Sequence, residues 1–302
     1  MLYASLNDSM QFVPDSSEVC YTLYWFYFMK NVQLLCLLLL FTTLACTSEQ
    51  ISDKAGGEKE ACFFYDDFDS FNDKVWTKEV REPGWVNQEL QAYDEAHVTV
   101  GKDGDRTVLI LTAEHENGRI YSGRINSKGK MSFKHRKVEA SIRLPKTANG
   151  LWPAFWMMGD NEKPWPACGE IDIMEMGEKH GIAQGTSETY LNTAIHYGSS
   201  VETHRQEYHA ADVAHSLQDG AYHLYTMEWD ENKLSVWIDQ MLFYTFDISP
   251  LSGRYEYFHD AYYVLFNMAV GGAFPNITDK NQITALREGE KAHMYVDWIK
   301  VY

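Results

Sequence analysis

Positive charge is scarce in this chain. Its 302 residues include 26 Lys and Arg against 43 Asp and Glu, so the formal net charge is −17 at pH 7. Proteins that hold a phosphate backbone or an anionic lipid surface do so with clustered Lys and Arg. The sequence contains no such cluster. This argues against nucleic-acid, anionic-membrane and polyanionic partners, and it favours a neutral or cationic substrate.

Cysteine is also rare and irregularly spaced. The five cysteines are Cys20, Cys36, Cys46, Cys62 and Cys168. Their separations match neither the paired spacing of a metal site nor a disulfide framework. Cys62 and Cys168 are therefore either a pair or two free buried thiols, and the sequence leaves both interpretations open.

Long hydrophobic runs are absent apart from one near the N-terminus. Residues 29–45 have a short basic start, an apolar run and small residues before Cys46, which is the anatomy of a secretory signal. The stretch resembles a bacterial lipobox. It predicts a removed leader, lipidation of Cys46 and a place in the bacterial cell envelope, or secretion if an ordinary signal peptidase cleaves. We interpret residues 1–28 as an upstream start-codon artefact; if they are translated, residues 21–45 form an uncleaved anchor.

The rest of the chain divides into a linker and one domain. Residues 47–60 are polar and free of aromatics, which is typical of a flexible tether. Residues 61–302 consist of short alternating apolar runs with turn residues between them and no long amphipathic helix. We therefore expect one all-β domain, a sandwich or a barrel. The expected strands are 108–113, 137–144, 222–229, 234–238, 241–246, 262–270 and 294–302.

Three carboxylates cluster within residues 169–175. In a plain strand Glu170 and Asp172 share one face and Glu175 points to the other. One extra residue, as in a β-bulge, returns Glu175 to the face of the other two. Acids interleaved with Ile, Ile and Met indicate a strand that is buried on one face and gathers its acids on the other. The stretch therefore predicts an active site rather than acids that only face water.

Two carboxylates across a glycosidic bond suffice to hydrolyse it. One protonates the leaving oxygen while the other attacks the anomeric carbon or activates a water, and for retention they lie roughly 5–5.5 Å apart. Asp172 would raise the proton affinity of its neighbours, or share a proton with one, which keeps one glutamate ionised and the other protonated. Aromatic residues make up 14% of the chain, a composition that suits stacking on sugar rings.

Further motifs surround the carboxylates. In order, they are Asn87–Gln91, Ser122–Ile125, Leu151–Met157, Trp165–Pro166, Gly169–Glu175, Ala194–Tyr197, Asn267–Gly272 and Tyr295–Tyr302. With them the chain resembles glycoside hydrolase family 16, in its bulge-containing laminarinase-like branch, over residues 61–302. The resemblance implies a concanavalin-like β-jelly-roll sandwich of two antiparallel sheets with a concave carbohydrate cleft, and double displacement with retention.

The resemblance also implies roles for individual residues. Glu170 matches the nucleophile, Glu175 the acid/base and Asp172 the carboxylate that supports the nucleophile. The positions that match substrate contacts in the cleft are Asn87, Arg124, Trp152, Trp156, Trp165, His196 and Asn267. No cofactor is implied for catalysis. A structural calcium is implied on the convex side, with Asp297 as a ligand and Asp66 and Asp67 as further contributors.

Because of two loops, the sequence does not determine which sugar and which linkage the enzyme cleaves. Residues 160–164 and 177–190 differ from the plainer connections of typical laminarinases, and loops at a cleft rim decide which linkage fits. The leading hypothesis is endo-acting retaining hydrolysis of β-1,3-glucan or mixed-linkage β-glucan by a monomer. The alternatives are an endo-β-galactosidase for galactose-based chains such as mucin O-glycans or keratan-type glycans, transglycosylation, and a non-catalytic glycan-binding lectin. The lectin would not require both Glu170 and Glu175.

Overall fold

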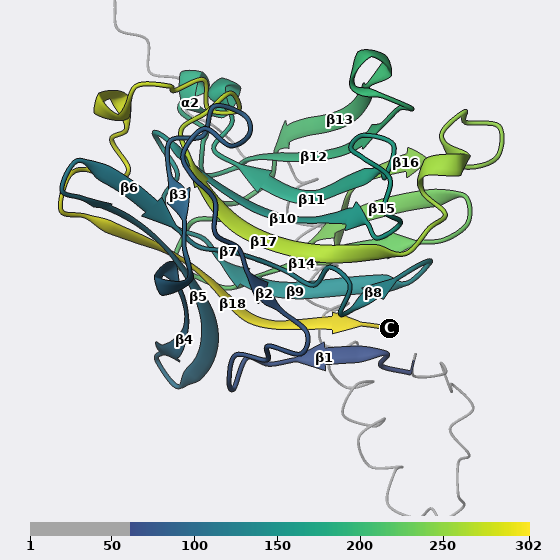
Figure 1. Ribbon diagram of the computed structural model, residues 1–302, viewed down its shortest axis with the longest axis horizontal. Helices are drawn as coiled ribbons and strands as arrows, with labels where there is room; N and C mark the ends of the chain where they lie inside the picture. The colour runs from purple at the N-terminus through teal and green to yellow at the C-terminus, as the bar shows by residue number, and fades with distance from the viewer. Residues whose placement is uncertain (1–60) are drawn as a thin grey trace, which may run out of the picture. The chain divides into compact units, whose positions relative to one another are not determined.

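Residues 61–302, the part described by this computed structural model, fold almost entirely as β-strands (Figure 1). The predicted leader, Cys46 and the linker lie outside the described residues. Within residues 61–302 one α-helix occurs, α2 (Lys179–Gln184), and no helix is long and apolar enough to cross a membrane. The expected all-β domain is confirmed.

Eight strands form the first sheet, in the order β13-β12-β11-β10-β17-β7-β2, with β8 paired to β17. Their bounds are β13 (Arg205–Asp212), β12 (Tyr190–Tyr197), β11 (Glu170–Met176), β10 (Leu151–Gly159), β17 (Tyr262–Val270), β7 (Arg124–Asn126), β2 (Thr77–Lys78) and β8 (Ser132–Phe133). All of these pairs are antiparallel. Strands β13, β12, β11, β10 and β17 lie side by side in Figure 1.

The second sheet has ten strands, in the order β16-β15-β14-β9-β18-β5-β6-β3, with β1 paired to β18 and β4 to β5. Their bounds are β16 (Met241–Asp247), β15 (Lys233–Ile238), β14 (His223–Trp229), β9 (Lys137–Arg143), β18 (Lys291–Val301), β5 (Arg106–Glu116), β6 (Arg119–Ser122), β3 (Ala92–Tyr93), β1 (Phe64–Asp66) and β4 (Val98–Asp103). Only β3 and β6 pair in parallel. The two sheets, antiparallel but for this pair, confirm the predicted sandwich.

Alternating apolar side chains explain why these segments become strands. Phe155 and Met157 of β10, Phe266 of β17 and Leu109 and Leu111 of β5 are fully buried. The rings of Phe155 and Phe266, on neighbouring strands, stack with centroids 4.8 Å apart. Burying one such side chain contributes about 1.5–3 kcal/mol. All seven strands expected from the sequence are present, and β5 and β18 extend beyond the apolar runs that predicted them.

The insert at residues 177–190 contains the short helix α2. The Glu178 side chain accepts a hydrogen bond from the N–H of His180 at its start, and Gly185 ends it with a φ of 73°, a conformation that glycine adopts without strain. The N–H of Lys179 donates to the carbonyl of Phe274 over 3.1 Å. The insert is thereby tied to the loop that carries Phe274.

The two cysteines of the domain are free thiols, so the first of the two interpretations from sequence is wrong. Cys62 is exposed and Cys168 is buried. Burial raises the pKa of Cys168 to about 11, which leaves it protonated and unreactive near neutral pH.

Candidate active site

Strand β11 carries the three predicted carboxylates, and it contains the predicted bulge. In the pairing with β10, Met174 lies opposite Phe155 and Asp172 lies opposite Trp156, so Ile173 has no partner on β10. The register of β11 with β12 shifts between Asp172 and Glu175. The extra residue re-aims the strand, so that Glu175 lies close enough to Asp172 for the charge of Asp172 to raise its pKa. The bulge follows from the sequence because no plain strand gathers these acids.

Each glutamate accepts a hydrogen bond from a tryptophan indole. Trp165 Nε1 donates to Oε2 of Glu170 over 3.0 Å, and Trp152 Nε1 donates to Oε1 of Glu175 over 2.9 Å. Trp165 lies in the loop after β10 and is 37% exposed. Trp152 lies on β10, where its ring stacks on Phe274 with centroids 4.7 Å apart. Two predicted cleft tryptophans therefore fix the orientation of both glutamates.

His196 lies beside the first glutamate, as its register partner across β11 and β12. Its Nε2 is 3.2 Å from Oδ2 of Asp172 and 3.7 Å from Oε1 of Glu170. Its Nδ1 lies 2.9 Å from Nε2 of His204, and the two rings stack at 6°. Trp165 packs against His204 with centroids 4.7 Å apart. Sequence reasoning did not single out His204. It contacts both His196, which lies beside Glu170, and Trp165, which donates to Glu170, and so it positions both.

Burial raises the pKa of all three carboxyl groups. The pKa of Glu170 rises to about 7 because of burial and the charge of Asp172, while His196 and the N–H of Trp165 oppose the rise. Burial also raises the pKa of Asp172. Burial and the charge of Asp172 hold the pKa of Glu175 well above its usual range. Burial thus raises the proton affinity of both glutamates, and a pKa of about 7 lets Glu170 ionise near neutral pH.

A buried chain of hydrogen bonds supports Trp156. Its Nε1 donates to Oδ1 of Asn267 over 2.7 Å, and Nδ2 of Asn267 donates to the Tyr93 hydroxyl over 3.2 Å. That hydroxyl donates to Oε2 of Glu89 over 3.1 Å, and Nδ2 of Asn87 donates to Oε1 over 3.3 Å. Asn87 is exposed and contacts Glu89 rather than the β11 carboxylates. Sequence reasoning took only Asn87 from its motif and missed buried Glu89 and Tyr93.

Arg124 is buried between two tryptophans. Its guanidinium carbon lies 4.9 Å from the ring centroid of Trp156 and 5.3 Å from that of Trp85. Its Nε donates to Oε1 of Glu79 over 3.0 Å. Trp85, which the sequence reading did not select, is 47% exposed, and the guanidinium carbon of Arg81 lies 4.4 Å from its ring centroid. The predicted Arg124 therefore supports the aromatic lining of this sheet face.

The predicted calcium ligand Asp297 lies on β18, and the calcium itself stays a prediction. Its carboxylate is ion-paired with Arg106. Oxygens of Asp66 accept hydrogen bonds from the N–H of Phe68 and the indole of Trp76. Among residues 61–302, no group of three His, Cys, Asp or Glu side chains that could hold a metal includes Asp297. Calcium therefore has no part in the mechanism below.

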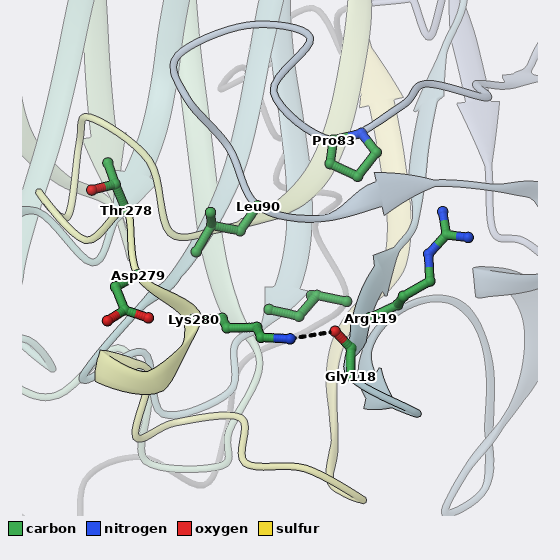
Figure 2. A pocket seen from close by; sticks show the side chains of 8 residues that line it. Pro83, Leu90, Gly118, Arg119, Thr278, Asp279 and Lys280 are labelled. Atoms are coloured by element: carbon green, nitrogen blue, oxygen red, sulfur yellow. Dashed lines mark hydrogen bonds between the residues drawn. The ribbon is translucent and has the colours of Figure 1, made fainter.

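A separate hollow of about 390 Å³ lies away from the three carboxylates (Figure 2). It is lined by Pro83, Leu90, Gly118, Arg119, Ile120, Thr278, Asp279 and Lys280. Lys280 Nζ donates to the carbonyl of Gly118 over 2.6 Å across it. None of the predicted site residues lines this hollow, and its one carboxylate belongs to Asp279. It lacks the acid pair that glycoside cleavage needs.

Comparison with known proteins places the sequence among related proteins. The sequence matches the description "Glycosyl hydrolases family 16" over residues 87–300. It is 32% identical to a "Beta-glucanase" of Rhodothermus marinus over 240 residues, which cover 75% of this chain and 78% of that protein. Two solved structures from Bacteroides ovatus cover 79% of this chain, and the match covers 99% of each. One is the family 16 protein of the mixed linkage glucan PUL in complex with a G4G4G3G product (66% identity, TM-score 0.77). The other is a family 16 endo-glucanase in complex with G4G3G-2F-DNP (65% identity, TM-score 0.76).

Proposed function

The chain belongs to glycosyl hydrolase family 16, and we propose that it is an endo-acting β-glucanase that cleaves mixed-linkage β-glucan with retention. The observation that carries the proposal is the bulged strand β11. It gathers Glu170, Asp172 and Glu175, and burial there raises the pKa of both glutamates. The Bacteroides ovatus and Rhodothermus marinus relatives, named for mixed linkage glucan and for β-glucanase, support the substrate.

The first step forms a glycosyl-enzyme. The ionised carboxylate of Glu170 attacks the anomeric carbon while the protonated carboxyl of Glu175 gives its proton to the leaving oxygen. The carbon–oxygen bond of the glycoside breaks, an ester to Glu170 forms, and the reducing-end fragment departs. Because the indole of Trp165 holds Oε2 of Glu170, we assign the attack to Oε1.

The second step releases the sugar. Esterification removes the charge of Glu170, which is one of the charges that raise the pKa of Glu175. With that charge gone, the carboxylate of Glu175 accepts a proton from water as the water attacks the anomeric carbon; the bond between that carbon and Glu170 breaks, and Glu170 returns as a carboxylate. The indole of Trp152 stabilises the resulting carboxylate. Two inversions at one carbon give net retention.

The aromatic side chains on this face fit a sugar-ring substrate. Trp152 and Trp156 alternate along β10 and share a face, and Trp165 and Trp85 are exposed beside it. Sugar rings have apolar faces that stack on indoles. We place β-glucan ahead of galactose-based chains because the relatives compared above are named for glucan, whereas the stacking contacts suit either sugar.

The test is a substrate panel with the mature protein. It is incubated with mixed-linkage β-glucan, laminarin, agarose, keratan-type chains and mucin, and the products are separated by chromatography while the viscosity is followed. We expect mixed-linkage β-glucan to be cleaved fastest, with an early fall in viscosity that marks endo action. Cleavage of galactose-based chains alone would overturn the substrate but leave the mechanism. Binding without cleavage would favour the lectin, and longer products from one labelled oligosaccharide would reveal transglycosylation.

We also propose that the mature chain is monomeric and is tethered to the bacterial envelope by a lipid on Cys46, with residues 47–60 as the linker. The support is the signal-like sequence of residues 29–45. The Cys46→Ser variant should move from the detergent phase to the aqueous phase in a phase-partition assay. An unchanged distribution would refute the lipid anchor, and light scattering of the soluble variant tests the monomer.

A further inference from the structure

Two histidines and an aspartate meet at the turn between β15 and β16. Nε2 of His215 and Nδ1 of His223 lie 2.9 Å and 2.7 Å from the same atom, Oδ2 of Asp239. The two imidazole rings lie 5.4 Å apart at 29°. One ligand atom from each side chain lies within 4.8 Å of the other two. Three segments thus converge on one point: the loop after β13, the start of β14 and the β15–β16 turn.

Two of the remaining polar atoms of this cluster, on His223 and Asp239, are held as a metal site requires. Nε2 of His223 lies 3.1 Å from Oδ1 of Asp219, and this bond turns Nδ1 toward Asp239. The N–H of Leu224 donates to Oδ1 of Asp239 over 2.8 Å, which leaves Oδ2 facing both imidazoles. A metal-binding histidine almost always gives its other ring N–H to a carboxylate or carbonyl. Asp219 supplies that carboxylate here.

The cluster is accessible from solvent on one side. The side chain of His215 is 42% exposed and that of Asp239 is 28% exposed, whereas that of His223 is only 7% exposed. His223 and Asp239 are thus held in place, whereas the side chain of the more exposed His215 can move. Two imidazole nitrogens and one carboxylate oxygen form a donor set that suits zinc and similar ions, at about 2.0–2.2 Å from each atom. The present distances of 2.9 Å and 2.7 Å need only a modest opening to admit an ion.

We propose that His215, His223 and Asp239 bind one divalent transition-metal ion of the zinc class, with water completing the coordination. This site is independent of the carboxylates on β11. Without an ion the same side chains form a hydrogen-bonded triad in which both imidazoles donate to one carboxylate. The ion replaces those shared protons.

The ion would hold in place the loop that connects the two sheets. Residues 213–222 leave β13 of the eight-stranded sheet and enter β14 of the ten-stranded sheet. The middle of this loop is anchored by buried Gln218, which accepts from the N–H of Thr147 over 2.8 Å and donates to the carbonyl of Ser187 over 2.8 Å. Coordination of His215 would add a second anchor, to the β15–β16 turn. An ion that binds the folded chain preferentially then raises its stability.

The test uses untagged mature protein, stripped with a chelator and titrated with zinc chloride in a calorimeter. We expect one zinc ion per chain and a higher melting temperature with zinc than without it. The His215→Ala variant should bind zinc more than about tenfold more weakly and lose the zinc-dependent rise in melting temperature. Its glucan hydrolysis and its melting temperature without zinc should equal those of the parent protein.

The matched control is His180→Ala. His180 is also exposed and lies 3.6 Å from the carboxylate of Glu178, on α2. This variant should bind zinc as the parent does, and Asp239→Asn should weaken binding as His215→Ala does. Absence of zinc binding by the parent overturns the proposal. Binding that survives His215→Ala overturns it as well, because the ion would then sit elsewhere, as at the group of Glu170, Asp172 and His196, whose ligand atoms also lie within 4.8 Å of one another.

Discussion

Two regions of the molecule shift the pKa of their carboxyl groups in opposite directions. On β11, burial raises the pKa of Glu170 to about 7 and that of Glu175 well above its usual range. At the β15–β16 turn, burial of Asp239 opposes ionisation, but the N–H of Leu224 and the imidazoles of His223 and His215 hold its pKa below its usual value. Burial acts in the same direction at both sites, raising the pKa of the carboxyl group, so burial alone does not explain the opposite shifts.

The difference lies in the partners. In the described part of the chain, neither Glu170 nor Glu175 has a Lys or Arg ion-pair partner, and each accepts instead from a neutral indole. An indole fixes the position of a carboxylate while leaving its proton affinity high. Glu79, elsewhere on the same sheet, is ion-paired with Arg124 and Arg81, and its pKa is lowered despite burial. The two glutamates assigned to the reaction are thus held by neutral donors, and the structural Glu79 is held by cations.

The largest expected effect is on catalysis by Glu170. Glu170→Gln should lower kcat/KM on mixed-linkage β-glucan by about 10⁴-fold or more, as removal of a nucleophile does. Ionising Glu170 in the fold is unfavourable, so its contribution to stability is lost as pH rises from 4.5 toward about 7. The variant should therefore melt above the parent protein at pH 8 and differ less at pH 4. The exposed Glu228→Gln on β14 is the control and should change neither property.

Glu175→Gln should lower kcat/KM on the glucan by about 10²–10⁴-fold, the usual contribution of general acid–base catalysis. The loss should be much smaller on an aryl glycoside whose leaving group needs no proton. With Glu175→Ala, added azide should restore turnover of that substrate and give a β-glycosyl azide, because azide then attacks the glycosyl-enzyme. An α-glycosyl azide from this variant would mean that Glu175 is the nucleophile and Glu170 the acid/base.

Glu79→Gln should act on stability rather than on the chemical step. Glu79 and Arg124 form a buried pair, with side chains 5% and 7% exposed. Removing one partner of a buried pair leaves the other charge uncompensated and costs about 3–5 kcal/mol. Denaturant unfolding should show this loss, in contrast to the gain expected for Glu170→Gln. Equal stability of Glu79→Gln and the parent would break the comparison between the two kinds of carboxylate.

The smallest effects concern the two indoles. Trp165→Phe removes a donor that favours ionised Glu170, so the pKa of Glu170 should rise and the acidic limb of kcat/KM should move upward by up to about one pH unit. Trp152→Phe removes the donor to Glu175 and should move the basic limb upward instead. The positions of the two limbs are read from profiles of kcat/KM against pH. A loss of sugar stacking lowers kcat/KM at every pH without moving either limb, so the two effects can be told apart. Identical shifts in both variants would contradict the separate roles.

The sequence allowed the bulge and the fold to be predicted because both depend on local pattern. The spacing of Glu170, Asp172 and Glu175 required an extra residue in the strand, and alternation along the chain predicted strands such as 262–270, which is β17 to the residue. The alternation of Trp152 and Trp156 likewise placed both on one face.

The sequence did not allow the supporting contacts to be predicted because they depend on how loops and distant segments fold. Tyr93 reaches Asn267 across 174 positions, and His204 contacts His196, 8 positions earlier, only because of the path of the loop between β12 and β13. Periodicity describes one strand and carries no information about which loop folds over it. The pairing of Asp297 with Arg106, 191 positions away, was hidden for the same reason.

The central claim is that Glu170 attacks the sugar, and covalent trapping tests it most directly. The mature protein is incubated with an activated 2-deoxy-2-fluoro β-glucan oligosaccharide, which slows release of the intermediate, and is then digested and analysed by tandem mass spectrometry. The account predicts one oligosaccharide ester per chain, on Glu170, and none in Glu170→Gln. An ester on Glu175 or Asp172, or no ester together with an inverted first product by NMR, would contradict it.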